Sequence, residues 1–169
     1  TMPGQCRLRL PADAFVDVEA ATSYLDIAEG LLRRGDPAGA FGSAAAALSI
    51  LRRPFLPSDS SPWAEGSQRR LARQCVRALH AVVKVHLANG EPQIAVELTN
   101  EAIACDGYQE ASYRLLMRAH AAAGNRAGAA RAYRDLAALL RNELETEPSP
   151  ETTALYRQLA GSAPSPTRR

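Results

Sequence analysis

Apolar residues recur along most of this chain at steps of three and four positions, the spacing of one face of an α-helix. In residues 17–34 they stand at Val18, Ala21, Leu25, Ala28 and Leu32. In residues 92–105 they stand at Ile94, Ala95, Leu98, Ala102 and Ile103. One short alternation of polar and apolar residues, at 6–10, predicts a single strand. The pattern therefore predicts a chain built almost entirely of amphipathic helices.

Local signals mark the ends of these helices. Proline follows a side-chain hydrogen-bond acceptor at Asp36-Pro37, Ser61-Pro62 and Ser149-Pro150, and such a pair is typical of a helix start. The pairs Gly-Asp, Asn-Gly and Gly-Asn at 35–36, 89–90 and 124–125 predict tight turns between paired helices. Together they predict seven helices, at about residues 17–34, 38–51, 62–88, 92–105, 109–123, 126–142 and 150–160.

The turn glycines also reveal a repeat. Gly124 follows Gly90 by 34 residues, the length of a tetratricopeptide unit. An alanine comes five positions after each of three glycines, in the pairs Gly35 with Ala40, Gly90 with Ala95 and Gly124 with Ala129. Seven positions further on stand Ala47, Ala102 and Leu136. Because one helical hairpin cannot bury its apolar side alone, we predict an all-α, tetratricopeptide-like right-handed solenoid of three hairpins plus a C-terminal capping helix.

Composition and charge change this picture little. Of the 169 residues, 46% are hydrophobic and only 5% aromatic, which fits a helical domain with one core. A formal net charge of +2 is weak evidence for a nucleic-acid partner. Since no apolar run approaches the ~20 residues of a membrane-spanning helix, we expect a cytoplasmic protein that makes no membrane contact.

Candidate catalytic or metal-binding chemistry is sparse. The cysteines are Cys6, Cys75 and Cys105, and the histidines are His80, His86 and His120. The cysteines form no Cys-x-x-Cys pair, and the histidines lack the spacing of a helical zinc pair. No glycine-rich phosphate loop and no nucleophile elbow occurs. We therefore expect buried free thiols, no metal, no cofactor and no enzymatic activity.

Several motifs follow one another in the order of a known bacterial family. Residues 131–151 contain a tyrosine-centred helix and end in Glu-Pro-Ser-Pro-Glu, and Leu155, Tyr156 and Leu159 continue the motif. Phe-Val-Asp-Val at 15–18, Arg-Pro-Phe-Leu at 53–56 and Pro-Trp at 62–63 precede it. Over about residues 5–160 the chain resembles the bacterial transcriptional activation domain of the Streptomyces antibiotic regulatory protein family. It departs from the family at Glu145, where a turn glycine is usual, and at Ala21, where an aromatic residue is usual.

This resemblance implies a domain organisation and a function. Residues 1–12 would be the last strand of a winged-helix DNA-binding domain with its linker, and residues 13–160 the activation domain. Residues 161–169 are polar and proline-rich, so we expect a disordered tail. The implied role is regulation of transcription through a homodimer and through contacts with RNA polymerase subunits or other regulatory proteins, with DNA bound only by the preceding domain.

A row of basic side chains on the third predicted helix is one candidate interaction surface. This basic row consists of Arg69, Arg73, Arg77, His80 and Lys84. Its spacing places the five side chains within an arc of roughly 80°, opposite an apolar face. We expect the row to point away from the packed core, as ordinary solvated surface or as a binding surface for an acidic protein or nucleic acid. First helices of hairpins line the concave side of tetratricopeptide stacks, so the row is expected in the groove.

The fifth predicted helix carries the second candidate surface, at Tyr113, Arg114, Met117 and Arg118. Aromatic, flexible apolar and cationic side chains together suit protein contact. Core packing is the competing interpretation for Tyr113 and Met117. Two other functions stay open at this point: a free-standing adaptor that binds acidic peptides, and a domain that senses a small ligand in its concave face.

Overall fold

The computed structural model describes residues 9, 11 and 14–161, and in that part of the chain it contains seven α-helices and no strand. The helices are α1 (Asp17–Arg33), α2 (Pro37–Leu51), α3 (Pro62–Ala88), α4 (Pro92–Cys105), α5 (Glu110–Ala122), α6 (Arg126–Leu144) and α7 (Pro150–Gly161). The strand predicted at 6–10 lies almost entirely outside the described residues, as does the predicted tail apart from the last residue of α7.

The predicted helix starts are confirmed by their capping hydrogen bonds. The Asp36 carboxylate accepts a hydrogen bond from the backbone N–H of Gly39 at 2.8 Å, and Ser61 Oγ accepts one from Ala64 at 3.3 Å. Asn125 caps α6 in the same way. Each cap satisfies a backbone donor that has no partner inside the helix, which fixes the first residue of the helix.

The three turn glycines close the first helix of each hairpin. Gly35, Gly90 and Gly124 have φ values of +77°, +74° and +72°, a left-handed conformation that costs glycine little. In each turn the residue after the glycine donates its N–H five residues back, as Asn125 does to the His120 carbonyl at 2.8 Å. This Schellman arrangement reverses the chain within a few residues and brings the second helix against the first.

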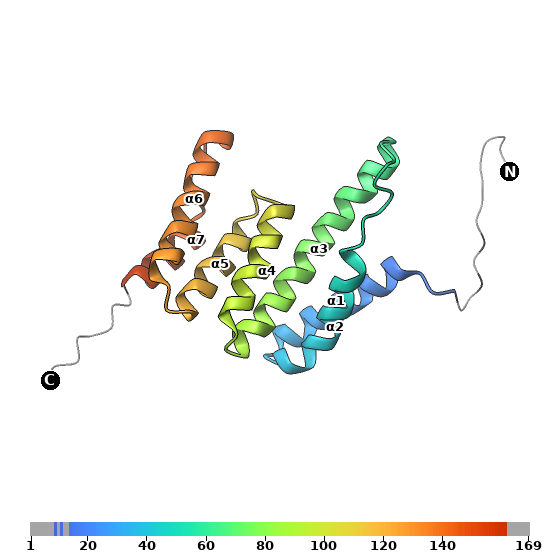
Figure 1. The fold of residues 1–169 in the computed structure, drawn as a ribbon, viewed down its shortest axis with the longest axis horizontal. Helices are drawn as coiled ribbons and strands as arrows, with labels where there is room; N and C mark the ends of the chain where they lie inside the picture. The colour runs from blue at the N-terminus through green and yellow to red at the C-terminus, as the bar shows by residue number, and fades with distance from the viewer. Residues whose placement is uncertain (1–8, 10, 12–13, 162–169) are drawn as a thin grey trace.

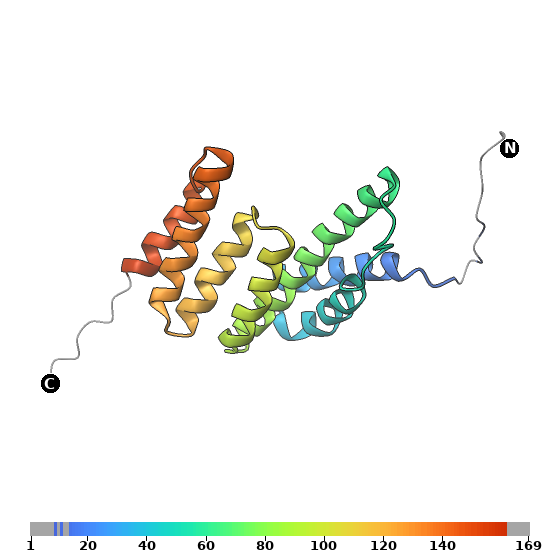
Figure 2. The ribbon, with the colours of Figure 1, turned by 45° about the horizontal axis from the view of Figure 1, so that its top comes forward.

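The hairpins α1–α2, α3–α4 and α5–α6 are stacked along the long axis of the molecule, and α7 closes the stack beside α6 (Figures 1 and 2). Besides pairing with its neighbour in sequence, each odd-numbered helix contacts the next odd-numbered helix, in the pairs α1–α3, α3–α5 and α5–α7. This is the predicted tetratricopeptide-like solenoid of three hairpins and a capping helix. The N-terminal half of the long helix α3 extends beyond the shorter helices (Figure 1).

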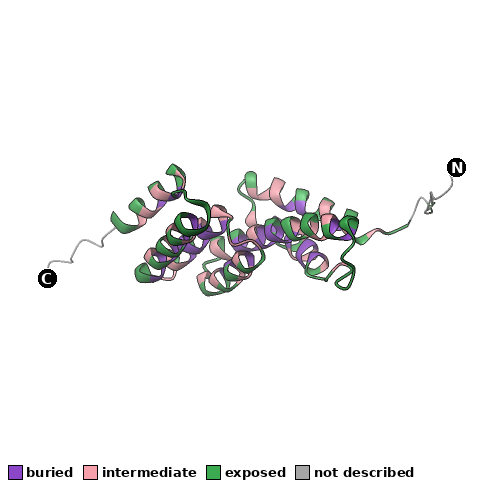
Figure 3. Ribbon diagram, turned by 90° about the horizontal axis from the view of Figure 1, so that it is seen from above, coloured by how far each residue is buried: buried purple, intermediate pink, exposed green. Residues whose placement is uncertain are grey.

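Small residues line the seams between paired helices. The alanines at these positions are all buried: Ala40, Ala44, Ala47, Ala95, Ala102, Ala129 and Ala132. Buried positions follow the helix contacts through the stack, and exposed positions face outward (Figure 3). Alanine lets two helix axes approach closely, so these positions set the spacing of the hairpins.

The end of α6 is the one helix boundary that differs by two residues from its predicted place. The helix continues to Leu144, and Glu145 then adopts a left-handed conformation with φ of +51°. The N–H of Thr146 donates to the Leu140 carbonyl at 3.2 Å and closes the turn. Glu145 therefore occupies the position of the turn glycine that the family pattern led us to expect, with the same backbone geometry.

In the described range 14–161, no helix has both the length and the apolar character needed to cross a lipid bilayer.

Candidate functional site: a basic groove along the odd-numbered helices

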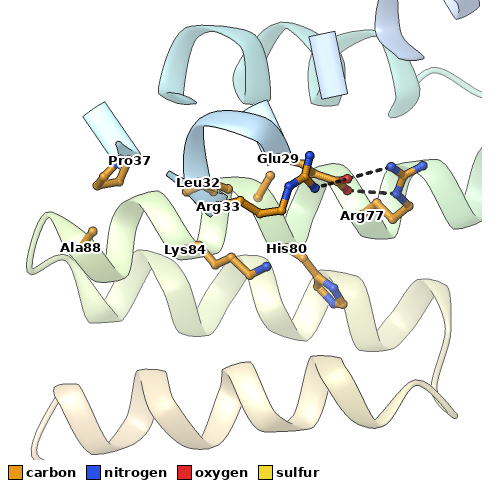
Figure 4. Close-up of a pocket in the computed structure, with 9 residues that line it drawn as sticks. Glu29, Leu32, Arg33, Pro37, Arg77, His80, Lys84 and Ala88 are labelled. Carbon is orange, nitrogen blue, oxygen red and sulfur yellow. Dashed lines mark hydrogen bonds and ion pairs between the residues drawn. The ribbon is translucent and has the colours of Figure 1, made fainter. Parts of the chain in front are cut away.

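A hollow of about 550 Å³ lies where the C-terminal part of α1 meets the C-terminal half of α3. Its lining comprises Glu29, Leu32, Arg33, Pro37, Arg77, His80, Ala81, Lys84 and Ala88 (Figure 4). Three of the five basic-row residues, Arg77, His80 and Lys84, are among them, so this part of the row borders the hollow between α1 and α3. Apolar side chains make up part of the lining, which gives the hollow both a charged and an apolar wall.

Arg77 is held by an ion pair across the groove. Its guanidinium donates two hydrogen bonds to the Glu29 carboxylate, at 3.0 and 2.9 Å, and a third contact reaches Asp26 at 3.5 Å (Figure 4). The hydrogen bonds to Glu29 are the main reason why the pKa of Arg77 rises above its usual value. Arg77 thus joins α3 to α1 by an ion pair, although 43% of its side chain stays exposed, so it is a surface cation that already has a partner.

His80 also has a partner, on α5. Its Nε2 lies 2.8 Å from the hydroxyl of Ser112 on α5. Burial, and then the positive charges of Lys84 and Arg114, lower the pKa of His80 from 6.5 to about 4. His80 is therefore neutral at physiological pH, and its place in the row is that of a link between α3 and α5, not that of a cation on a free face.

Lys84 has a different environment. Its side chain is exposed, and within the described part of the chain it forms neither a hydrogen bond nor an ion pair. Arg118 on α5 stands 34 residues later, one repeat length on, and is likewise exposed without such a partner among the described residues. The repeat places these two cations at equivalent positions on the contacting helices α3 and α5, and of the two Lys84 lines the hollow.

The remaining two members of the basic row lie on the protruding half of α3. Arg69 is exposed and pairs loosely with Glu65 one turn earlier, at 3.6 Å. Arg73 is exposed and has no ion-pair partner among the described residues. These two arginines fit the interpretation as solvated surface, whereas Lys84 lies in the groove.

Of the four candidate residues on α5, the two apolar ones are buried in the core and the two arginines are not. Met117 is 0% exposed and packs with Ala129, Ala132 and Leu155, and Tyr113 is buried beside Leu136. The alternative of core packing therefore applies to both side chains. They point into the hairpin because they lie on the face of α5 that meets α6.

Arg114 connects α5 to the capping helix. It donates a hydrogen bond to Thr152 Oγ1 at 2.8 Å and approaches Glu151 at 3.3 Å. Glu110 accepts hydrogen bonds from Ser149 and Thr152 at the start of α7. Burial opposes ionisation of Glu110, but these hydrogen bonds and the Arg114 charge outweigh it and lower the pKa. Arg114 is thus largely committed to structure, which leaves Arg118 as the accessible cation of α5.

The expectation of buried thiols holds for one of the two described cysteines. Cys75 on α3 is buried, and burial raises its pKa to about 11. Cys105 at the end of α4 is exposed, contrary to expectation, although partial burial also raises its pKa. Both thiols are therefore mainly protonated and weakly nucleophilic at neutral pH. Cys6 lies outside the described residues.

Sequence reasoning missed an apolar surface at the α1 end of the stack. Phe15 is 73% exposed and Trp63 is 66% exposed, and the Trp63 ring meets Phe55 edge-on at 6.0 Å between centroids. Val16 and Val18 border one hollow of about 440 Å³ together with Phe55 and Trp63. Pro-Trp and Phe-Val-Asp-Val are present as motifs in the sequence, but only the fold brings the two segments together. We call this the aromatic end.

Fold and groove together define the chain as a tetratricopeptide-like stack with a mixed basic and apolar concave face. The sequence profile described as the bacterial transcriptional activator domain matches residues 16–160. The chain therefore belongs to the bacterial transcriptional activator domain family, and the resemblance drawn from its motifs is confirmed. No curated protein sequence gives a significant match.

Two solved structures share this fold. EmbR from Mycobacterium tuberculosis, in complex with a low-affinity phosphopeptide, aligns with a TM-score of 0.83 at 21% identity, over 94% of this chain and 42% of EmbR. The C-terminal TPR-containing domain of a Plasmodium falciparum FK506-binding protein aligns with a TM-score of 0.60 at 12% identity, over 87% of this chain and 92% of that domain. The chain thus spans less than half the length of EmbR, and at these identities the two likenesses support the fold alone.

Proposed function

We propose that this chain is the regulatory, protein-binding domain of a bacterial transcription activator, acting in the cytoplasm through self-association and contacts with RNA polymerase or other regulatory proteins. The observation that carries the proposal is the family match over residues 16–160. In this account DNA is recognised by a separate winged-helix domain of the full-length activator. The stack itself contributes exposed surface and shape for contact with other proteins.

The mechanism is recruitment and not catalysis. The polar groups that line the groove are mostly held in structural pairs, such as Arg77 with Glu29 and His80 with Ser112. A domain that contacts polymerase adds its binding free energy to that of the promoter complex. About 1.4 kcal/mol of such contact raises occupancy about tenfold, so a weak and specific contact is sufficient.

Activation is tested by tethering. We expect the chain, fused to the DNA-binding domain of an unrelated repressor, to raise transcription from a reporter whose promoter carries that repressor's operator. The matched control is the same fusion with Met117→Asp, which places a charge in the core and should unfold the domain. A fusion that binds the operator but activates no more than the unfolded control would contradict the proposed function.

The aromatic end supports the self-association part of the proposal. Trp63 borders the hollow and Phe15 precedes the bordering Val16, and such exposed aromatic side chains are the kind of surface that a second copy of the chain can cover. We expect light scattering to show a dimer at micromolar concentration, and Phe15→Ser with Trp63→Ser to shift it to the monomer. Tyr108→Ser removes a similarly exposed aromatic from the α4–α5 turn and should leave the dimer intact. A monomeric unmodified chain would contradict self-association through this domain.

A further inference from the structure

Two exposed cations stand at equivalent positions on the contacting helices α3 and α5, without counter-charges in the described part of the chain: Lys84, which lines the hollow, and Arg118, one repeat length later. Arg77 and Arg114 are ion-paired, while Lys84 and Arg118 are exposed and, in the described part of the chain, have no ion-pair partner. Arg33 at the rim of the hollow is only loosely held, with 3.9 Å between its guanidinium and Glu29 and 73% of its side chain exposed. The concave face therefore has a surplus of positive charge at defined positions.

Part of the lining of the hollow, beside Lys84, is apolar. Leu32, Pro37, Ala81 and Ala88 border the hollow next to Lys84 (Figure 4). A ligand that fits both parts carries carboxylates separated by apolar side chains. We propose that the groove binds an extended acidic segment of a partner protein, with Lys84 and Arg118 as the anchors for its aspartate or glutamate side chains; this proposal rests on the proposed role as a protein-contact domain.

The spacing of the anchors suits an extended peptide. Packed helix axes lie about 8–10 Å apart, and Lys84 and Arg118 occupy equivalent positions on the contacting helices α3 and α5. In an extended chain, side chains on one face recur about every 7 Å, because each residue advances about 3.4 Å. Long, flexible lysine and arginine side chains cover the remaining difference. Two carboxylates two residues apart can thus reach both anchors.

Two carboxylates favour a peptide over nucleic acid: Glu29, which lines the hollow, and Asp26, which pairs with the lining residue Arg77. Asp26 is 65% exposed at its side chain and Glu29 lines the hollow itself. A continuous phosphate backbone, with one charge about every 1.7 Å of duplex, would pass close to these carboxylates and be repelled. A peptide can place separate carboxylates at the two anchors and neutral side chains beside Asp26 and Glu29.

The test uses a fluorescein-labelled octapeptide in which glutamate alternates with leucine, and fluorescence anisotropy as the readout. We expect saturable binding that weakens as salt rises, and about tenfold or greater loss of affinity for Lys84→Glu combined with Arg118→Glu. The matched control is Arg134→Glu, an exposed arginine on α6 whose side chain bonds only to its own helix. The control variant should bind like the unmodified chain.

Three results would overturn the inference. The first is that a peptide with glutamine in place of glutamate binds as tightly as the glutamate peptide. The second is that Arg134→Glu loses as much affinity as the double anchor variant. The third is that random-sequence duplex DNA binds and the glutamate peptide does not displace it. Because both anchors are exposed, we expect their substitution to leave the fold intact. Circular-dichroism melting of each variant checks this. If peptide binding fails while the tethered fusion still activates its reporter, this inference falls and the proposed function stands.

Discussion

Three neighbours in the basic row, Arg77, His80 and Lys84, stand on one helix face and have three different roles. Arg77 is paired with α1, His80 is hydrogen-bonded to α5, and Lys84 is exposed. Helical spacing alone predicted that they share a face, and they do. It could not predict their partners, because those come from helices about 30 to 50 residues away in the sequence, as the separations of 48 and 32 residues show.

Arg77 is a poor position at which to test binding by charge reversal. Reversing the charge of Arg77 would place a carboxylate against Glu29 and Asp26, so it would disturb the α1–α3 contact as well as any binding. Lys84 and Arg118 are the better positions, because no ion pair is lost when they change.

Glu145 provides a prediction about backbone strain. A non-glycine residue at φ of +51° carries a steric cost that glycine does not. We expect Glu145→Gly to raise the free energy of unfolding by about 1 kcal/mol, measured by urea denaturation. Glu143 is an exposed residue of α6 with ordinary helical backbone, so Glu143→Gly should instead lower the free energy of unfolding by about 1 kcal/mol. Equal destabilisation by both substitutions would contradict the strain assigned to Glu145.

His80 predicts a pH dependence of stability. The unfolded chain protonates His80 near pH 6.5, whereas the folded chain does so only near pH 4 because burial, Lys84 and Arg114 oppose its charge. The unfolded state therefore binds more protons between these values, and stability falls as pH drops through this window. We expect His80 to account for about 2 kcal/mol of that loss.

The measurement is thermal or urea unfolding at several pH values between 7 and 4. His80→Gln should flatten the curve over this range while keeping a polar contact to Ser112. The charged side chains of Glu29 and Arg77 line the same hollow as His80, and salt screens their effect on it. The unfolding curves of the variant and the unmodified chain should therefore be measured at the same ionic strength. An unchanged slope in the variant would show that other groups cause the pH dependence.

At the scale of the helices, sequence and structure agree closely. Two of the seven predicted helices match exactly, four differ by one residue at one or both ends, and α6 alone runs two residues longer. The reason is physical: Asp36, Ser61 and Asn125 cap helices through bonds that span three residues. Such contacts join residues close together in the chain, so the sequence alone predicts them. The same holds for the left-handed glycines that end helices.

The alanine seams predict what overpacking would do. Ala95 is fully buried where α4 meets its neighbours, so we expect Ala95→Leu to lower the free energy of unfolding by about 1 to 3 kcal/mol. Ala104→Leu adds the same side chain at an exposed position of α4 and should change stability by less than about 0.5 kcal/mol. If the two variants unfold alike in urea, then the seam does not set the helix spacing.

At the scale of the whole molecule, the repeat length was sufficient to predict the stack, because each hairpin must bury its apolar face against the next. The candidate site was only partly predictable. The equivalence of Lys84 and Arg118 follows from the repeat, but the burial of Met117 and the aromatic end depend on how distant segments meet. A sequence pattern gives the face of one helix, and it does not say what covers that face.

Together, the proposed function and the proposed peptide-binding groove predict that this domain activates transcription through the groove. The most direct measurement compares reporter activity of three tethered fusions: the unmodified chain, Lys84→Glu with Arg118→Glu, and Arg134→Glu. We predict that the unmodified chain and Arg134→Glu activate equally and that the groove variant, although folded, loses most of the activation. Full activity of the groove variant would contradict the claim and place the activating surface elsewhere on the stack.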